Sequence, residues 1–196
     1  NTDFGAGSTY LFRLDYEGRI AYAEYSMSKT NSYGYMTNAW YDNNTEEAGI
    51  KVFTATGEWK NFELAKKVKF NNTSLKKEAL CGENKLTPQL IAYTLNSQGL
   101  ISKIKTGVSN ASGEEMNFAE LSGKYLYVNR SFNSTYFLTD TLVFSIPANL
   151  DDKGLYRVTT CDYLRDGQDY SAKVYAIDEN CPEVAVVEEI DTYSTE

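Results

Sequence analysis

This 196-residue chain contains no histidine, so carboxylates and aromatic rings are the side chains with which it could catalyse a reaction or bind a ligand. Without histidine, the commonest general base and the commonest metal ligand are both missing. Two facing carboxylates could still cleave a glycosidic bond, and Glu24, Glu58 and Asp162 are candidates for such a pair. No spacing singles out two of them. The sequence therefore favours a non-catalytic protein over a carbohydrate-active enzyme.

Motifs for nucleophilic catalysis and for phosphate binding are also missing. The chain has no G-x-S-x-G elbow and neither of the two glycine-rich phosphate loops. Acidic pairs at residues 151–152 and 178–179 could bind calcium or form solvated turns, but the EF-hand spacing is absent. We therefore expect no catalytic residue, no metal site and no cofactor.

Three cysteines cannot all pair within one chain, and none of them has C-x-x-C spacing. A zinc site or a thioredoxin-type site is therefore not expected. One disulfide between Cys161 and Cys181 is possible in an oxidising compartment. The alternative is that Cys81, Cys161 and Cys181 are buried or partly buried thiols.

Aromatic residues are the second resource, with 16 tyrosines and two tryptophans. Exposed flat rings can stack on sugars, so a carbohydrate-binding face is one interpretation. The other is that alternate rings fill a β core while the rest cover cross-strand neighbours. The candidate stacking residues lie in the first half of the chain: Tyr33, Tyr35, Trp40, Tyr41 and Trp59.

The net charge of −8 is unevenly distributed. Residues 1–105 carry 13 basic and 11 acidic side chains, whereas residues 106–196 carry 6 basic and 16 acidic ones. An acidic chain repels phosphate backbones, so we expect no nucleic-acid partner. The two halves could attract each other within one molecule or between neighbouring copies. A local cluster could be a basic binding site or a solvated edge: Lys66, Lys67, Lys69, Lys76 and Lys77.

Three segments share one pattern of strand, four-residue loop ending in glycine, and strand: LDYEGRIAYAEY (14–25), FTATGEWKNFEL (53–64) and LNSQGLISKIKT (95–106). Such loops suit hairpins built on a type I turn, in which the glycine takes positive φ. The first and third segments align without gaps over a longer stretch. This similarity indicates either two related β subdomains or a chance likeness between two ordinary hairpins.

Many further β-prone segments and no long amphipathic helix predict an all-β protein of two small barrel-like or sandwich-like units. Short helical turns are expected only at 73–80 and 160–164. We expect a loose lead-in at 1–9, a first unit at 10–106 and a second at 107–196. An alternative boundary lies near residue 86.

Five motifs occur in a recognisable order: YGYMTNAWYD, IKVFTATGEWKNFELAKKVKFN, LIAYTLNSQGLISKI, FLTDTLVFSIP and YSAKVYAID. Together they resemble the C-terminal β-rich region of clostridial (Firmicutes) surface proteins that carry S-layer homology domains. The resemblance implies an extracellular, cell-surface location. It also implies cell-envelope components, or other copies of the chain, as partners. These motifs belong to a fold and bring no catalytic residues with them.

These observations together favour a non-catalytic structural or adhesive module of a secreted bacterial cell-surface protein. A carbohydrate-binding module is the alternative, and a carbohydrate-active enzyme is a third. The chain begins with Asn1 and its first methionine is Met27, so we expect a fragment of a larger secreted protein. No apolar run reaches the length of a membrane span.

Overall fold

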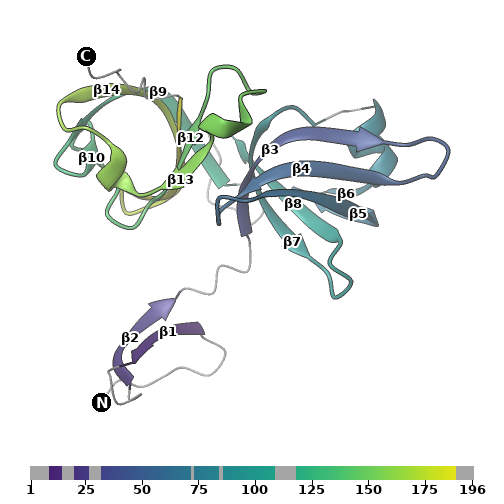
Figure 1. Ribbon diagram of the computed structural model, residues 1–196, viewed down its shortest axis with the longest axis horizontal. Coiled ribbons are helices and arrows are strands. Elements are labelled where there is room, and N and C mark those ends of the chain that lie inside the picture. The colour runs from purple at the N-terminus through teal and green to yellow at the C-terminus, as the bar shows by residue number, and fades with distance from the viewer. Residues whose placement is uncertain are drawn as a thin grey trace. The chain divides into compact units, whose positions relative to one another are not determined.

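The computed structural model describes strand residues 9–14 and 20–26 and residues 32–71, 73–83, 86–108 and 118–188. These residues form strands and a few short helical turns, which confirms the predicted all-β fold. The chain divides into two compact units, Asn1–Ser32 and Tyr33–Glu196. The first unit contains an antiparallel hairpin of strands β1 and β2 (Figure 1). These strands span Thr9–Leu14 and Ile20–Ser26.

The first half of the second unit is a closed five-stranded barrel, which we call barrel A (residues 33–108). Its strands follow the order β3-β4-β5-β8-β7 and return to β3. The parallel pairing of β5 with β8 closes the ring. The strands are β3 (Ser32–Tyr41), β4 (Ala48–Thr54), β5 (Trp59–Phe70), β7 (Gln89–Leu95) and β8 (Ile101–Val108).

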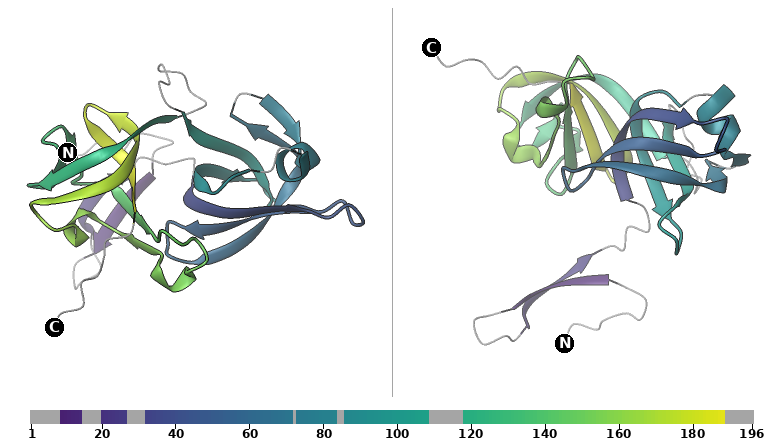
Figure 2. Two further views of the ribbon diagram at one scale, coloured as in Figure 1. Left: turned by 90° about the horizontal axis from the view of Figure 1, so that it is seen from above. Right: turned by 45° about the vertical axis from the view of Figure 1, so that its right-hand side comes forward.

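The second half is a more open barrel, which we call barrel B (residues 118–188). Its order β12-β15-β14-β9 corresponds to β5-β8-β7-β3 of barrel A, while β10 pairs with β9 and with β11. Strand β9 pairs with β10 and β14, β14 pairs with β15, and β15 runs parallel to β12 (Figure 2). The strands are β9 (Phe118–Val128), β10 (Ser131–Phe132), β11 (Tyr136–Phe137), β12 (Leu142–Ile146), β14 (Gln168–Asp178) and β15 (Cys181–Glu188).

Both barrels also share the elements between their third and fourth strands. Strand β6 (Thr73–Lys76) pairs with β5, and β13 (Arg157–Thr159) pairs with β12. A helical turn follows each extra strand: a π-helix at Ala79–Glu83 in barrel A and a 3₁₀ turn at Cys161–Tyr163 in barrel B. Another 3₁₀ turn, Lys153–Leu155, precedes β13. The strand order 1-2-3-5-4-1 of barrel A is that of the Greek-key barrels called OB-folds.

The helical turns plug the barrels because they carry apolar side chains into the two cores. Leu80 and Cys81 of the π-helix belong to the core of barrel A. Cys161 and Leu164 belong to the core of barrel B. The two buried cysteines stand 80 residues apart at corresponding positions, so each is a small apolar residue of a plug.

Two of the three predicted hairpins are seen in full, as β4–β5 and β7–β8. Their turns are alike: Gly57 and Gly99 have φ of 77° and 78°, and each donates its N–H to the first residue of the turn, Thr54 or Asn96, at 2.9 and 3.0 Å. Positive φ is the conformation for which glycine is needed. The loop of the hairpin at 14–25 lies outside the described residues.

The structure places two segments differently from the sequence prediction. Residues 10–106 are predicted as one unit, but the larger compact unit begins at Tyr33. Within the helical stretch predicted at 73–80, residues 73–76 form strand β6, because their backbone groups pair with β5. The turn predicted at 160–164 is present. The lead-in up to residue 8 and residues 109–117 lie outside the described residues.

Candidate functional site

The five aromatic residues singled out in the sequence do not form one face. Tyr33, Tyr35 and Trp59 belong to a buried cluster between the two barrels. Trp40 and Tyr41 lie at the other end of β3 and line a pocket. The predicted set therefore divides into a structural group and a group that remains accessible.

The buried cluster between the barrels, which we call the joint, is made of rings and aliphatic side chains from both. The Tyr156 ring of barrel B lies 5.4 Å from Phe53 and 4.7 Å from Trp59, both on barrel A. Phe144 of barrel B is fully buried and lies 6.4 Å from Phe53. Edge-to-face contacts of this kind add to the free energy gained from burial. The joint therefore fixes barrel A against barrel B.

A polar contact also crosses between the barrels. The Tyr33 hydroxyl donates a hydrogen bond to the Glu183 carboxylate at 2.7 Å. Burial, together with this carboxylate, raises the pKa of Tyr33 above its usual value. The hydroxyl therefore stays protonated at neutral pH and can keep donating this bond.

Trp40 and Tyr41 open onto a pocket of about 720 Å³ at the plugged end of barrel A, which we call the Trp40 pocket. Its wall combines the end of β3 with the plug. The Trp40 indole lies over Gly49 of β4, where a Cβ would come within 2.5 Å of the ring. Glycine at this position therefore leaves room for the indole. The remaining lining residues are Asn38, Ala39, Asn43, Glu78, Cys81 and Gly82.

The loop that follows Tyr41 is held by its own hydrogen bonds. The Asp42 carboxylate accepts from the N–H of Asn44 at 2.7 Å and of Thr45 at 3.3 Å. The Asp42 N–H donates to the Glu47 carbonyl at 2.8 Å. The first two bonds are both accepted by Oδ1 of Asp42, and together the three bonds fix the loop that carries Asn43 beside the pocket.

The surroundings of Tyr41 are acidic. Burial raises the pKa of Tyr41, and the carboxylates of Glu78, Glu46 and Asp42 raise it further. Three carboxylates near one hydroxyl create a negative potential at this end of barrel A. An anionic ligand would be repelled there, whereas a neutral one would not.

The cysteine in this wall is inert. The Cys81 thiol is buried and donates to the Gly49 carbonyl at 3.8 Å. Burial raises the pKa of this thiol to about 11, so it is not a nucleophilic thiolate at neutral pH. All three cysteines are free: Cys161 is buried and Cys181 is exposed, and the disulfide considered for these two is not formed.

A second cavity, of about 670 Å³, lies between the barrels. Tyr35 and Gln89 of barrel A line one side, and Ser122, Lys124 and Ser171 of barrel B line the other. A nearby lysine, Lys173, is paired with Glu120 at 3.1 Å. The sequence patterns did not indicate this groove, because it depends on how the barrels pack.

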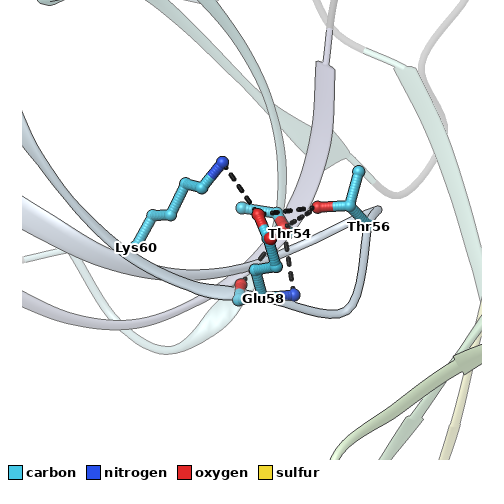
Figure 3. Close-up of polar contacts among 4 residues, drawn as sticks. All are labelled: Thr54, Thr56, Glu58 and Lys60. Atoms are coloured by element: carbon cyan, nitrogen blue, oxygen red, sulfur yellow. Dashed lines mark hydrogen bonds and ion pairs between the residues drawn. The ribbon is translucent and has the colours of Figure 1, made fainter.

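Two of the candidate catalytic carboxylates have structural partners on exposed turns. Glu58 pairs with Lys60 at 2.9 Å and accepts from Thr56 at 3.3 Å (Figure 3). The Thr54 hydroxyl bonds within the same turn, 3.1 Å from the Glu58 carbonyl, so this network stabilises the β4–β5 hairpin. Asp162 pairs with Arg130 in barrel B. The side chain of Glu24 lies outside the described residues.

No group of three potential metal ligands occurs among the described residues. The calcium candidates at 151–152 and 178–179 are exposed residues of turns and strand ends. Within the same part of the chain, no helix is both long and apolar enough to span a bilayer.

The basic cluster lies on the outer strands of barrel A. Lys67 of β5 is the register partner of Lys76 on β6, and Lys69 is the partner of Lys103 on β8. Like charges on neighbouring strands repel each other. This arrangement gives β6, β5 and β8 a positive face, while the predicted members Lys66 and Lys77 lie beside it.

Comparison with known proteins identifies no relative. No protein-family model, curated protein or solved structure matches this chain.

Proposed function

We propose that the chain is a non-catalytic structural module of a secreted bacterial cell-surface protein. The observation that supports this role best is the joint, in which Phe53 and Trp59 of barrel A pack on Phe144 and Tyr156 of barrel B. Neighbouring domains move relative to each other unless their interface is hydrophobic and extensive. A buried aromatic interface makes the two barrels one stiff spacer. The cell-surface location rests on the sequence resemblance described above.

The same module could contact other copies of itself. The positive face formed by Lys67, Lys69, Lys76 and Lys103 belongs to barrel A, whereas the net negative charge belongs to the second half of the chain. Attraction between these regions of neighbouring copies would weaken with salt. Sedimentation at low salt should therefore show concentration-dependent association that disappears near 0.5 M salt. A monomer at every concentration in low salt would rule out this contact.

The carbohydrate-binding alternative relies on the five predicted aromatic residues, but three of them, Tyr33, Tyr35 and Trp59, pack in the joint. Trp40 and Tyr41 line the Trp40 pocket, and Tyr35 also lines the cavity between the barrels.

Incubation of the purified chain with bacterial sacculi tests the structural role. We expect no release of reducing sugars or soluble wall fragments. Sacculi with and without attached polysaccharide separate a spacer, which pellets with neither, from an adhesive module, which pellets with one of them. Release of wall fragments by the chain would contradict a non-catalytic function.

A further inference from the structure

We propose that the Trp40 pocket binds a neutral saccharide, with the Trp40 indole as its stacking surface and Asn43 among its hydrogen-bonding groups. This site goes beyond the proposed spacer role and does not depend on it. It would give barrel A a ligand of its own.

The stacking surface is held in place from below. The indole lies over Gly49, where no side chain intervenes, and Trp40 itself is only partly buried. A Cβ on Gly49 would also come within 2.8 Å of the Phe62 carbonyl, so the sheet beneath the ring is tightly packed. A large ring with little rotational freedom loses little entropy when a ligand covers it. These properties suit the apolar face of a pyranose ring.

Polar side chains surround this ring without filling the space beside it. Asn38 is exposed on β3, and Asn43 projects from the loop that Asp42 holds in place. Glu78, which precedes the π-helix in the chain, is another lining residue. Amide and carboxylate groups together offer both donors and acceptors, which matches the paired character of sugar hydroxyls. The volume of about 720 Å³ lies within the range of small-molecule sites.

The plug supplies an independent indication of function. Residues Ala79–Glu83 form a π-helix, a rare conformation that occurs frequently at functional sites. Cys81 and Gly82 of this turn line the pocket, and a Cβ on Gly82 would lie 3.7 Å from the Tyr41 ring. The π-helix therefore brings its backbone next to the Tyr41 ring in the wall of the pocket.

The charge of the site selects the class of sugar. Glu78 is the charged residue among those that line the pocket, and Glu46 and Asp42 lie near the Tyr41 hydroxyl, so the nearby charges are carboxylates. Acidic sugars and phosphate-bearing polymers would be repelled, whereas the positive face on β6, β5 and β8 would not repel them. A neutral oligosaccharide is the ligand that fits both the ring and the charge.

Fluorescence titration of the full chain tests this proposal directly. The chain has two tryptophans, so Trp59→Phe leaves Trp40 as the reporter. The probes are cellotriose, tri-N-acetylchitotriose and mannotriose, with trigalacturonate as the acidic counterpart. We expect at least one neutral trisaccharide to change the Trp40 emission saturably, and trigalacturonate to have no effect.

Matched variants locate the binding. In the Trp59→Phe background, Asn43→Ala should weaken binding at least fivefold, while Asn61→Ala, an exposed asparagine outside the pocket, should leave it unchanged. Trp40→Phe should weaken binding at least tenfold, as measured by saturation-transfer NMR. Its far-ultraviolet circular dichroism spectrum should stay that of the parent chain. Failure of all three neutral probes at 10 mM would overturn the proposal. Equal effects of Asn43→Ala and Asn61→Ala, or equal binding of trigalacturonate, would overturn it as well.

Discussion

Barrel A and barrel B follow one strand order but fill their interiors differently. The core of barrel A is mostly aliphatic, with Ile50, Val52, Ile101 and Ile104 at its centre. The core of barrel B is built around rings: Tyr125, Tyr127, Phe132 and Tyr170. The same topology is therefore compatible with two kinds of packing.

The difference in core composition accompanies a difference in hydrogen bonding. Each barrel uses other side chains to hold the long connection between its third and fourth strands. In barrel B the Tyr127 hydroxyl donates to the Cys161 carbonyl at 2.8 Å, and the Tyr170 hydroxyl accepts from the Arg165 N–H at 2.8 Å. In barrel A the Asn71 carboxamide oxygen accepts from the Thr106 N–H at 2.9 Å. Buried backbone groups need such partners, and tyrosine supplies one together with apolar bulk.

The two barrels also differ in where they leave aromatic side chains accessible. Barrel B uses its tyrosines for its own interior and for the joint. Barrel A, filled by aliphatic residues, leaves Trp40 and Tyr41 at its plugged end. In our proposal, barrel A therefore carries the ligand site, and both barrels contribute to the joint.

Phe144→Ala, in the joint, should have the largest effect. This ring is fully buried, and truncating such a residue costs about 3–5 kcal/mol of unfolding free energy. Phe137→Ala is the matched control, because Phe137 is 48% exposed and should change stability by less than about 0.5 kcal/mol.

Both tryptophans lie in barrel A, so denaturation followed by tryptophan fluorescence reports whether this truncation in barrel B destabilises its neighbour. If barrel A of the Phe144→Ala chain unfolds at the same denaturant concentration as in the parent chain, the two barrels are not coupled through this ring.

High pH should lower the free energy of unfolding, because buried tyrosines in barrel B and in the joint lose stabilisation there. Burial raises the pKa of Tyr127 and of Tyr156 to about 12. Below pH 10 both the folded and the unfolded chain keep these protons, so the stabilisation is intact. Between pH 10 and 12 the unfolded chain loses them first, and stability falls by roughly 1 kcal/mol per pH unit for each tyrosine.

Denaturation midpoints measured from pH 9 to 12 check this expectation, and Tyr127→Phe should make the decline shallower. A decline that is unchanged in Tyr127→Phe would show that this buried hydroxyl does not cause it.

Gly57→Ala and Gly99→Ala should each cost about 1–2 kcal/mol, because alanine is strained at the φ of 77° and 78° found there. These turns join strands of the closed barrel, so the loss should be seen in barrel A. Gly154→Ala is the control in barrel B, since its Cβ would have no neighbour within 4 Å and its φ is not positive. Thermal unfolding of the three variants gives the comparison, and equal losses would refute the turn argument.

Lys60→Ala should have the smallest effect. The Lys60–Glu58 pair spans 2.9 Å, but both side chains are at least half exposed. Exposed pairs contribute roughly 0–1 kcal/mol and are screened by salt. We expect a loss of less than about 0.5 kcal/mol that vanishes in 1 M salt. A loss above about 2 kcal/mol would mean that the turn network in Figure 3 stabilises barrel A more than Gly57 does.

Local patterns were sufficient for the hairpins and the all-β class, because Gly57 and Gly99 mark turns whose strands are neighbours in sequence. The parallel pairings of β5 with β8 and β12 with β15 join distant segments, and no local pattern encodes them.

The same limit explains the aromatic residues. Trp40 and Trp59 have similar strand contexts, yet Trp59 is covered by Tyr156 from the other barrel. Asn43 reaches the Trp40 pocket from the loop after β3, whereas Glu78 and Gly82 reach it from the helical segment at 77–83, and these two segments share no motif. Burial of Cys81 and Cys161 was among the alternatives left open by the sequence, while their shared role as plug residues required the fold.

Backbone ¹⁵N relaxation of the intact chain tests most directly whether the joint makes the two barrels one body. The account predicts one rotational correlation time for amides of β4 in barrel A and β14 in barrel B. Separate, shorter correlation times for the two barrels would contradict it, because they would mean that the packing of Phe53, Trp59 and Tyr156 does not hold the barrels together.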